Sequence, residues 1–169
     1  MPNLTTLIIG GNTFHSTTEL DLSSFSSLES ITFGERLFSR VSTFRIDGLN
    51  RLKSFKTGYR SFQTSGNGKS GYFQISNCES LESIQIGGGS FLYYSGGFEL
   101  KNLPKLKSIE LNTPGYYDCG FCYCSFVIRG MDMILNVSII RSSKFTFHYN
   151  GWFCLFSFLN NNNRKYSMN

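Results

Sequence analysis

The residues of this 169-residue chain that could do chemistry are few, and the densest group is Cys119, Cys122 and Cys124. Thiolates at this spacing can bind Zn²⁺, but a closed zinc site has four ligands. The candidates for the fourth ligand, none of which completes a second C-x-x-C pair, are Cys78, Cys154 and Asp118. A redox dithiol would need a βαβ context, which the sequence lacks. We therefore favour three thiols in a long corner loop over a metal or redox centre.

Catalytic constellations are not evident elsewhere. The two histidines, His15 and His148, stand near opposite ends of the patterned chain and cannot share a site. The run Gly87–Gly89 follows an expected strand but opens no helix, so it is interpreted as a turn that needs positive φ, not as a phosphate loop. No nucleophile motif or metalloprotease motif occurs. The sequence therefore predicts that the chain is not an enzyme and has no cofactor.

Composition and charge exclude further classes. The formal net charge is +5, from 16 Lys+Arg and 11 Asp+Glu, but the signs are mixed along the chain and no basic stripe marks a nucleic-acid interface. The 17 Phe and 9 Tyr residues suit a β-rich structure. The sequence has five cysteines and opens directly into patterned sequence without a signal peptide, which favours a cytoplasmic setting.

The elements that must position any site are repeats. Apolar anchor residues recur every 24 to 29 positions, at Leu4, Leu28, Leu52, Leu81, Leu106 and Ile134. Three positions after each anchor stands another apolar residue: Leu7, Ile31, Phe55, Ile84, Ile109 and Val137. Ten positions after the first five anchors stands an aromatic residue: Phe14, Phe38, Phe62, Phe91 and Tyr116. Such agreement predicts stacked repeats, in which each strand pairs with its copy in the next repeat about 4.8 Å away.

A second alternating stretch precedes each later anchor. It contributes the apolar pairs Leu20/Leu22, Phe44/Ile46, Phe73/Ile75, Phe98/Leu100 and Phe126/Ile128. Alternation with a period of two places one set of side chains inward and the other outward. Each repeat is therefore expected to contain two strands.

This pattern resembles the leucine-rich-repeat family, whose motif is matched best by Leu4-x-x-Leu7-x-Ile9-x-x-Asn12-x-Phe14. The resemblance covers residues 2–145. The other copies lack the Asn and have Arg36, Arg60, Gly89, Pro114 and Ser142 there, so they are similar to the irregular, aromatic-rich repeats of protist and bacterial surface proteins. The resemblance implies a right-handed β-solenoid of about six repeats with little helix, a parallel sheet on its concave side and a second row of short strands opposite.

Two surfaces could bind a partner. One is the outward face of the concave sheet, with Glu29, Lys53, Lys56, Glu82, Gln85, Lys107 and Glu110, although a cross-strand ion ladder explains these charges slightly better. The other consists of aromatic residues in neighbouring corner loops: Tyr93, Tyr94, Tyr116, Tyr117, Phe121 and Tyr123. These aromatic side chains would either anchor an interface or close their own corners over the core.

The ends of the chain depart from the pattern. The array is expected over 2–145, an irregular apolar cover over 146–159 and a disordered tail over 160–169. The apolar stretch 145–159 falls short of the ~20 residues of a membrane-spanning helix, so a span is not favoured. The missing polar cap before residue 2 suggests a fragment of a longer array.

The function predicted is a scaffold that binds a protein partner, and the sequence does not indicate an oligomeric state. The alternative is a cell-surface or adhesion module that recognises glycans or host proteins, to which two possible glycosylation sites, at Asn3 and Asn136, would be suited. A zinc-dependent enzyme built on Cys119–Cys124 is a third, less favoured option.

Overall fold

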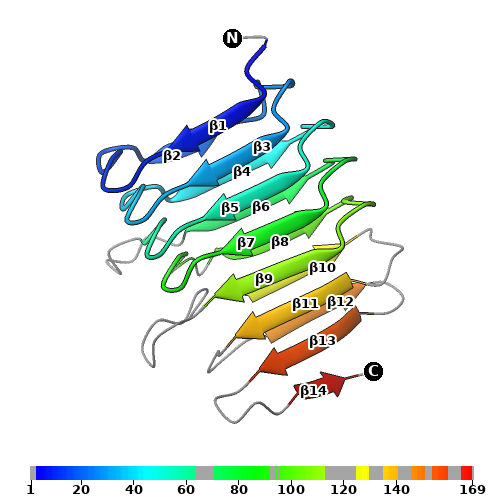
Figure 1. The fold of residues 1–169 in the computed structure, drawn as a ribbon. Coiled ribbons are helices and arrows are strands. Elements are labelled where there is room, and N and C mark those ends of the chain that lie inside the picture. The colour runs from blue at the N-terminus through cyan, green and yellow to red at the C-terminus, as the bar shows by residue number, and fades with distance from the viewer. Residues whose placement is uncertain are drawn as a thin grey trace.

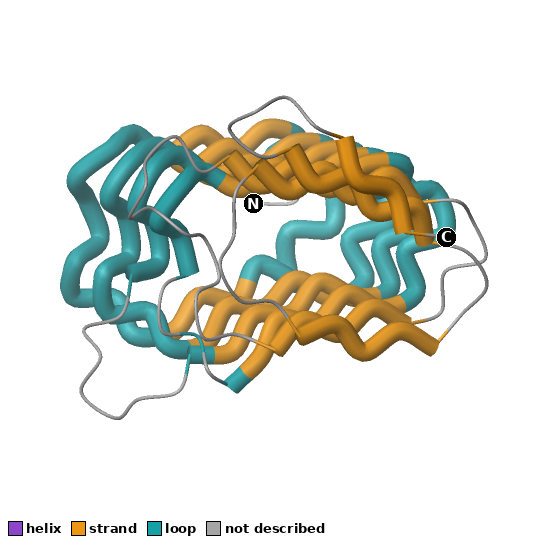
Figure 2. The backbone as a smooth tube through the Cα atoms, turned by 90° about the horizontal axis from the view of Figure 1, so that it is seen from below, coloured by secondary structure: helices purple, strands orange, loops and turns teal. Residues whose placement is uncertain are grey.

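The computed structural model describes residues 3–63, 71–91, 94 and 96–112, with side chains to residue 110. Beyond residue 112 it describes the backbone of strands at 125–129, 135–140, 146–150, 154–159 and 165–168. The described residues form a β-solenoid of stacked, mainly parallel strands and contain no helix (Figure 1). Seen along the stack, the strands form two opposed layers joined by corner loops on both sides (Figure 2).

The first layer is an eight-stranded sheet. Its strands, in spatial order, are β1 (Thr6–Ile9), β3 (Ser30–Phe33), β5 (Ser54–Thr57), β7 (Ser83–Ile86), β9 (Ser108–Asn112), β11 (Leu135–Ile140), β13 (Cys154–Leu159) and β14 (Lys165–Met168). All neighbours pair in parallel except β13 and β14. The predicted register is confirmed, because Leu7, Ile31, Phe55, Ile84, Ile109 and Val137 are successive Cα partners.

The second layer is a six-stranded parallel sheet. It comprises β2 (Glu19–Asp21), β4 (Thr43–Asp47), β6 (Tyr72–Ser76), β8 (Gly97–Lys101), β10 (Ser125–Arg129) and β12 (Thr146–Asn150). The prediction that this row is the shorter one holds only for some strands. Strands β4, β6 and β8 have five residues each, against four in β3, β5 and β7. Strand β2, however, has three against four in β1, and β10 and β12 have five against six in β11 and β13. Two inward apolar residues, such as Phe44 and Ile46, alternate with outward residues along a strand of this sheet. One outward residue lies between the two, and one lies on either side of them.

The C-terminal segments also differ from expectation. Strands β12 and β13 lie within 146–159, for which we predicted an irregular cover, yet they extend the two sheets by in-register parallel pairing with β10 and β11. Strand β14 lies within 160–169, predicted to be disordered, and pairs antiparallel with β13.

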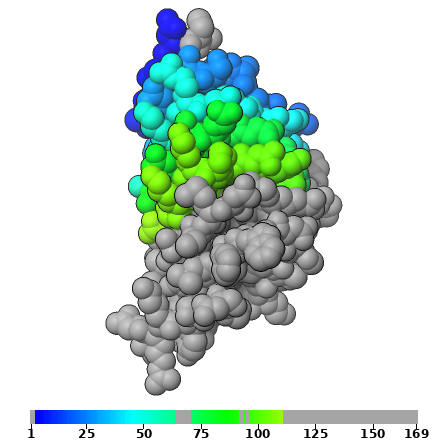
Figure 3. All heavy atoms as spheres, turned by 90° about the vertical axis from the view of Figure 1, so that its right-hand side faces the viewer, coloured from blue at the N-terminus to red at the C-terminus, as the bar shows by residue number. Residues whose placement is uncertain are grey.

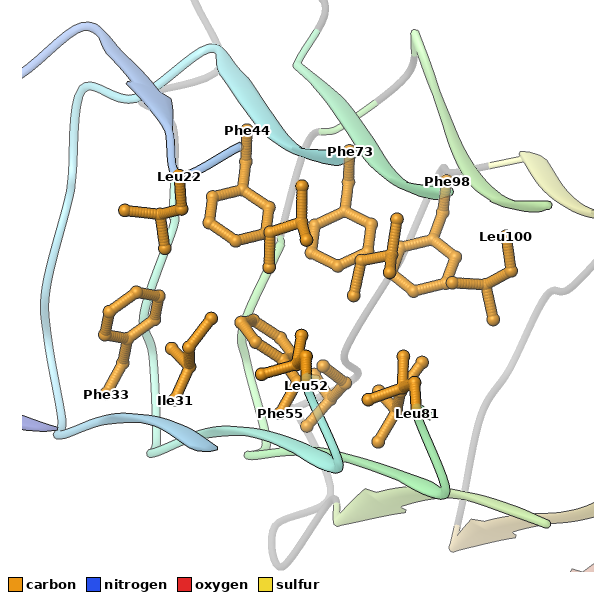
Figure 4. Close-up of a cluster of buried hydrophobic side chains, with 14 of the residues drawn as sticks. Leu22, Ile31, Phe33, Phe44, Leu52, Phe55, Phe73, Leu81, Phe98 and Leu100 are labelled. Atoms are coloured by element: carbon orange, nitrogen blue, oxygen red, sulfur yellow. The ribbon is translucent and has the colours of Figure 1, made fainter. Parts of the chain in front are cut away.

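Aromatic side chains stack through the core in two ladders. From the second sheet, Phe44, Phe73 and Phe98 are fully buried, with neighbouring ring centroids 4.9 and 4.1 Å apart (Figure 4). From one corner, Phe38, Phe62 and Phe91 are likewise buried, with centroids 4.9 and 4.7 Å apart. Burying each ring contributes roughly 1.5–3 kcal/mol, and a well-placed aromatic pair adds about 0.5–1.5 kcal/mol.

The corners that follow β1, β3, β5 and β7 are built on a stack of glycines. A Cβ atom on Gly34 would lie 2.8 Å from the backbone nitrogen of Gly11, and one on Gly87 would lie 2.3 Å from the carbonyl carbon of Gly58. Such separations are shorter than carbon atoms allow, so only glycine permits the rungs to approach this closely here. Of the run Gly87–Gly89, interpreted as a turn, Gly89 does have positive φ (69°).

The same corner contains two left-handed residues in each of the first four copies, the part of the array in which the structure describes it. One is the position of Asn12 in the first copy, where Asn12, Arg36 and Arg60 have φ of 58°, 53° and 54°. Their backbone N–H groups donate to the carbonyls of Glu35, Tyr59 and Gly88 in the next copy, over 2.9, 2.9 and 2.8 Å. Backbone donors turned by the left-handed conformation therefore connect the rungs at this corner, and a side-chain Asn ladder is not needed.

The second left-handed position holds the corner aromatics. Phe14, Phe38, Phe62 and Phe91 all have φ between 56° and 58°. This conformation costs an L-residue roughly 1–2 kcal/mol, which the burial and stacking of the ring offset.

The first copy is the open end of the described stack, whose successive segments form bands in Figure 3. Phe14 is 51% exposed and Ile8 71% exposed, whereas Phe38, one copy along from Phe14, is 1% exposed. Phe14 stacks on Phe38 with one face only, at 5.5 Å between centroids.

Candidate functional site

The outward face of the first sheet presents side chains in rows, because the strands pair without a shift. One row runs through Thr6, Ser30, Ser54, Ser83 and Ser108, and a second through Ile8, Thr32, Lys56, Gln85 and Glu110. All ten side chains are half-buried or exposed. The parallel pairing thus holds a regular polar surface with small hydroxyl side chains beside longer ones.

Charged residues just before the strands form ion pairs between copies. Glu29 accepts from Lys53 at 2.8 Å and from Arg51 at 2.7 Å, and Glu82 accepts from Lys107 at 2.8 Å. The Lys53 hydrogen bond is the main reason why the pKa of Glu29 lies below its usual range, and the Lys107 hydrogen bond lowers the pKa of Glu82 in the same way. The predicted ion ladder is confirmed for these pairs. Because the pairs are exposed, each adds little stability.

The remaining predicted residues of this face lie beside one another on the second row. Gln85 donates from Nε2 to a carboxylate oxygen of Glu110 over 2.8 Å. Lys56 is exposed, and among the described residues it has no hydrogen-bond or ion-pair partner. The structure therefore brings all seven charged or polar candidates of the sheet to one face.

Of the predicted aromatic corner surface, the structure describes one residue, Tyr94. Tyr94 is fully buried, its hydroxyl donates to the carbonyl of Val41, and its ring lies against Gly71, so the expectation that it contacts a partner was wrong. Burial raises the pKa of this phenol far above its usual value. Tyr94 closes its own corner, the alternative that the sequence left open. The other candidates, Tyr93, Tyr116, Tyr117, Phe121 and Tyr123, lie outside the described residues.

The cysteine and histidine chemistry can be followed only in part. Cys119, Cys122 and Cys124 lie outside the described residues. Cys78 is a free thiol, fully buried in the core, and burial raises its pKa to about 11, which disfavours the thiolate that a zinc ligand needs. Nδ1 of His15 lies 3.3 Å from the hydroxyl of Ser39. Within the described part of the chain, no three His, Cys, Asp or Glu residues gather as a metal site would require.

Sequence reasoning missed a polar network at the corners that follow strands β4, β6 and β8. Asp47 accepts hydrogen bonds from Ser76 (2.8 Å) and Asn77 (2.7 Å), and Asn77 in turn accepts from Asn102 (2.8 Å). The Ser76 hydroxyl is the main reason why the pKa of Asp47 is lowered. The sequence contained a signal for this network, since Asn77 and Asn102 occupy the same position in their repeats. Because these groups satisfy one another, we assign the network a structural role.

A groove of about 280 Å³ was also missed, at the glycine corner. It is lined by His15, Arg36, Ser39, Arg60 and Gln63. The sequence signal was the recurrence of arginine, Arg36 and Arg60, at the position that Asn12 occupies in the first copy.

Comparison with known proteins identifies no relative of this chain. No protein-family model matches the chain, and neither the curated proteins nor the solved structures contain a match. None of the described residues forms a helix with the length and apolar character needed to cross a bilayer. The assignment to leucine-rich repeats therefore stays a prediction from the residues.

Proposed function

We propose that this chain is a protein-binding scaffold of the leucine-rich-repeat type, with about six irregular, aromatic-rich repeats. The observation that carries the proposal is the first sheet, whose outward side chains stand in rows across successive parallel strands. A partner would meet a surface whose side-chain spacing is set by backbone pairing, so little conformational entropy is lost when it binds.

The make-up of this face supports a protein partner. Serine and threonine hydroxyls occupy one row, while Lys56, Gln85 and Glu110 provide a cation, an amide and a carboxylate on the next. The exposed Ile8 adds an apolar contact at the open end of the same face. Mixed hydrogen-bonding groups around small residues suit a folded protein surface better than a nucleic-acid backbone, which requires a run of cations.

A comparison of two charge-reversal variants tests the proposal. Lys56→Glu/Glu110→Lys alters the outward face of the first sheet, and Arg45→Glu/Lys101→Glu alters exposed residues of the second. In quantitative affinity capture, a partner of the first sheet is retained by the parent chain and by the second-sheet variant but lost from the first-sheet variant. Capture of the same proteins to the same extent by both variants would contradict the proposal.

One observation favours a second candidate, the cell-surface module. Asn3 and Thr5 of the sequence Asn3-Leu4-Thr5 are both exposed in the first copy, so this possible glycosylation site is accessible. Mass spectrometry of the chain from its native source decides between the two settings: a glycan on Asn3 supports the surface module, and an unmodified Asn3 in every molecule supports the intracellular scaffold.

A further inference from the structure

A groove of about 350 Å³ lies at the corners that follow strands β4, β6 and β8, on the edge of the solenoid opposite to the glycine corner (Figure 2). Its exposed lining residues form two rows across three successive copies. The first row is Gly48, Asn77 and Asn102, and the second, two residues later in each copy, is Asn50, Glu79 and Pro104. The groove therefore extends along the stack and crosses three rungs.

The backbone fixes the spacing of the rungs at this corner. The three residues of the first row, Gly48, Asn77 and Asn102, are left-handed, with φ of 72°, 53° and 52°. The N–H of Gly48 donates to the carbonyl of Ser76 over 3.1 Å, and the N–H of Asn77 donates to the carbonyl of Lys101 over 3.0 Å. These hydrogen bonds continue the strand pairing beyond the sheet, so successive residues of each row stand one rung apart, about 4.8 Å.

The structural network around Asp47 orients the amides of the first row. Nδ2 of Asn102 donates to Oδ1 of Asn77 over 2.8 Å, and Nδ2 of Asn77 donates to a carboxylate oxygen of Asp47 over 2.7 Å. Because a carboxylate only accepts, both amides are held with their NH₂ groups toward Asp47. Each NH₂ group uses one of its two hydrogens in this chain, and Oδ1 of Asn77 uses one of its two lone pairs. The first row therefore retains donors and acceptors for a ligand.

The second row adds polar groups that the fold does not use. Asn50 and Glu79 form no side-chain hydrogen bond or ion pair with any other described residue. Beside Asn50 the first row has Gly48, where a Cβ atom would meet nothing within 4 Å, so this end of the groove is open. None of the lining residues is a cation and Glu79 is a carboxylate, so the groove does not suit an anionic ligand.

We propose that this groove binds a neutral, extended oligosaccharide that lies along the stack. A sugar hydroxyl both donates and accepts, and an amide side chain offers a donor and an acceptor in one plane, so two neighbouring hydroxyls can pair with one amide. The carboxylate of Glu79 accepts from hydroxyls, and the ring of Pro104 offers an apolar surface to the C–H groups of a sugar ring.

The length of the groove supports a chain of sugars over a single sugar. The rung spacing of about 4.8 Å is close to the advance of one unit in an extended β-linked chain, so successive rungs would meet successive sugars. This activity goes beyond the proposed scaffold function and does not rest on it, since it uses other residues on another edge of the solenoid.

Titration of the purified chain with the β-1,4-linked tetrasaccharides of glucose, N-acetylglucosamine and mannose tests the proposal. At least one of them should shift, saturably, the side-chain NH₂ NMR signals of Asn50, Asn77 and Asn102 and the backbone amide signals of residues 48–50 and 77–79. The corresponding monosaccharide should bind roughly tenfold more weakly, because it meets one rung instead of three. Absence of saturable shifts with all three tetrasaccharides, or equal affinity for the monosaccharide, would overturn the proposal.

In Asn50→Ala/Glu79→Ala the affinity should fall roughly tenfold, since two hydrogen-bonding groups are lost. The matched control is Glu35→Ala/Gln63→Ala, which removes a carboxylate and an amide from the glycine corner on the opposite edge and leaves the affinity unchanged. Equal affinities of the two double variants would show that the sugar binds elsewhere. A thermal melt verifies that each variant is folded; if the first melts early, Asn50→Ala alone replaces it, with an expected loss of about threefold.

Two further comparisons separate a neutral sugar from other ligands of the same groove. Glu79→Gln removes the charge and keeps a planar hydrogen-bonding group, so the affinity for the tetrasaccharide should change by less than about threefold. A much larger loss would show that the groove selects a positive charge, contrary to the proposal. A Gly-Ser peptide of similar length should give no saturable shift, and tighter binding of this peptide than of every tetrasaccharide would overturn the assignment to a sugar.

Discussion

A Cβ atom on Gly58 would lie 2.7 Å from the carbonyl carbon and oxygen of Gly34, its equivalent one copy earlier. The same contact recurs between Gly87 and Gly58. The N–H of Gly58 meanwhile donates to the carbonyl of Phe33 over 2.8 Å, so the approach continues the pairing of strands β3 and β5 into the corner. The glycines thus allow successive copies to be equally close in the sheet and in the corner.

Gly58→Ala should lower the free energy of unfolding by about 1–3 kcal/mol or more, because the added methyl collides with backbone that cannot move without separating the rungs. The matched control is Gly10→Ala at the same position of the first copy, where a Cβ meets nothing within 4 Å. That change should stay within about 0.5 kcal/mol. Urea unfolding followed by circular dichroism measures both, and equal effects would contradict the close approach.

The strands and their register were predictable because the pattern has two periods. The alternation predicted which residues point inward, and the repeat length aligned Ile31 with Phe55 and Phe55 with Ile84. The strand pairing in the structure has the same register. The corners were not predictable in this way. Arg36 and Phe38 adopt a left-handed backbone that their residue types disfavour, and only the stacking of several copies makes that conformation favourable.

The candidate surfaces were predictable where alternation decides exposure. It placed Lys56, Gln85 and Glu110 on one face, and the structure agrees. Tyr94 was misjudged because no period governs a corner of variable length, and a tyrosine there can point either way. Its hydroxyl donates a hydrogen bond to the backbone carbonyl of Val41, which is 53 residues away in the sequence. No local sequence pattern predicts such a contact.

Phe62→Ala should destabilise the chain by about 3–5 kcal/mol, since the ring is fully buried and packs on Phe38 and Phe91. Phe14→Ala removes an equivalent ring that is half exposed and stacks on one side only, so we expect less than half of that loss. Denaturant midpoints of the two variants give the comparison. A larger loss at Phe14 would mean that the first copy is not the open end of the stack.

Arg36→Gly should raise the free energy of unfolding by up to about 1 kcal/mol, although glycine usually weakens a structure. The reason is the left-handed backbone of Arg36 (φ 53°), which glycine adopts without strain, as Gly89 does in a later copy. The control is Arg45→Gly in strand β4, which should destabilise by roughly 0.5–1 kcal/mol. Thermal melts of both variants measure the contrast, and a loss at both positions would refute the corner geometry.

Cys78 should make the chain less stable as the pH rises from about 9 to about 11. Burial raises the pKa of its thiol from 9.0 to about 11, so above pH 9 the unfolded chain loses a proton that the folded chain retains. The stabilisation is therefore fully present below pH 9 and disappears as the pH passes through the folded value. Cys78→Ala lacks the group, so its urea midpoint should fall less than that of the parent between pH 8.5 and pH 10.5, roughly the interval in which the unfolded thiol ionises. The cavity left by the substitution lowers both midpoints of the variant alike and cancels in the difference. In the folded parent, Cys78 itself should also resist a thiol reagent at pH 8.5, because its side chain is fully buried. Rapid modification of Cys78 without unfolding, located by peptide mass spectrometry, would place this residue outside the core.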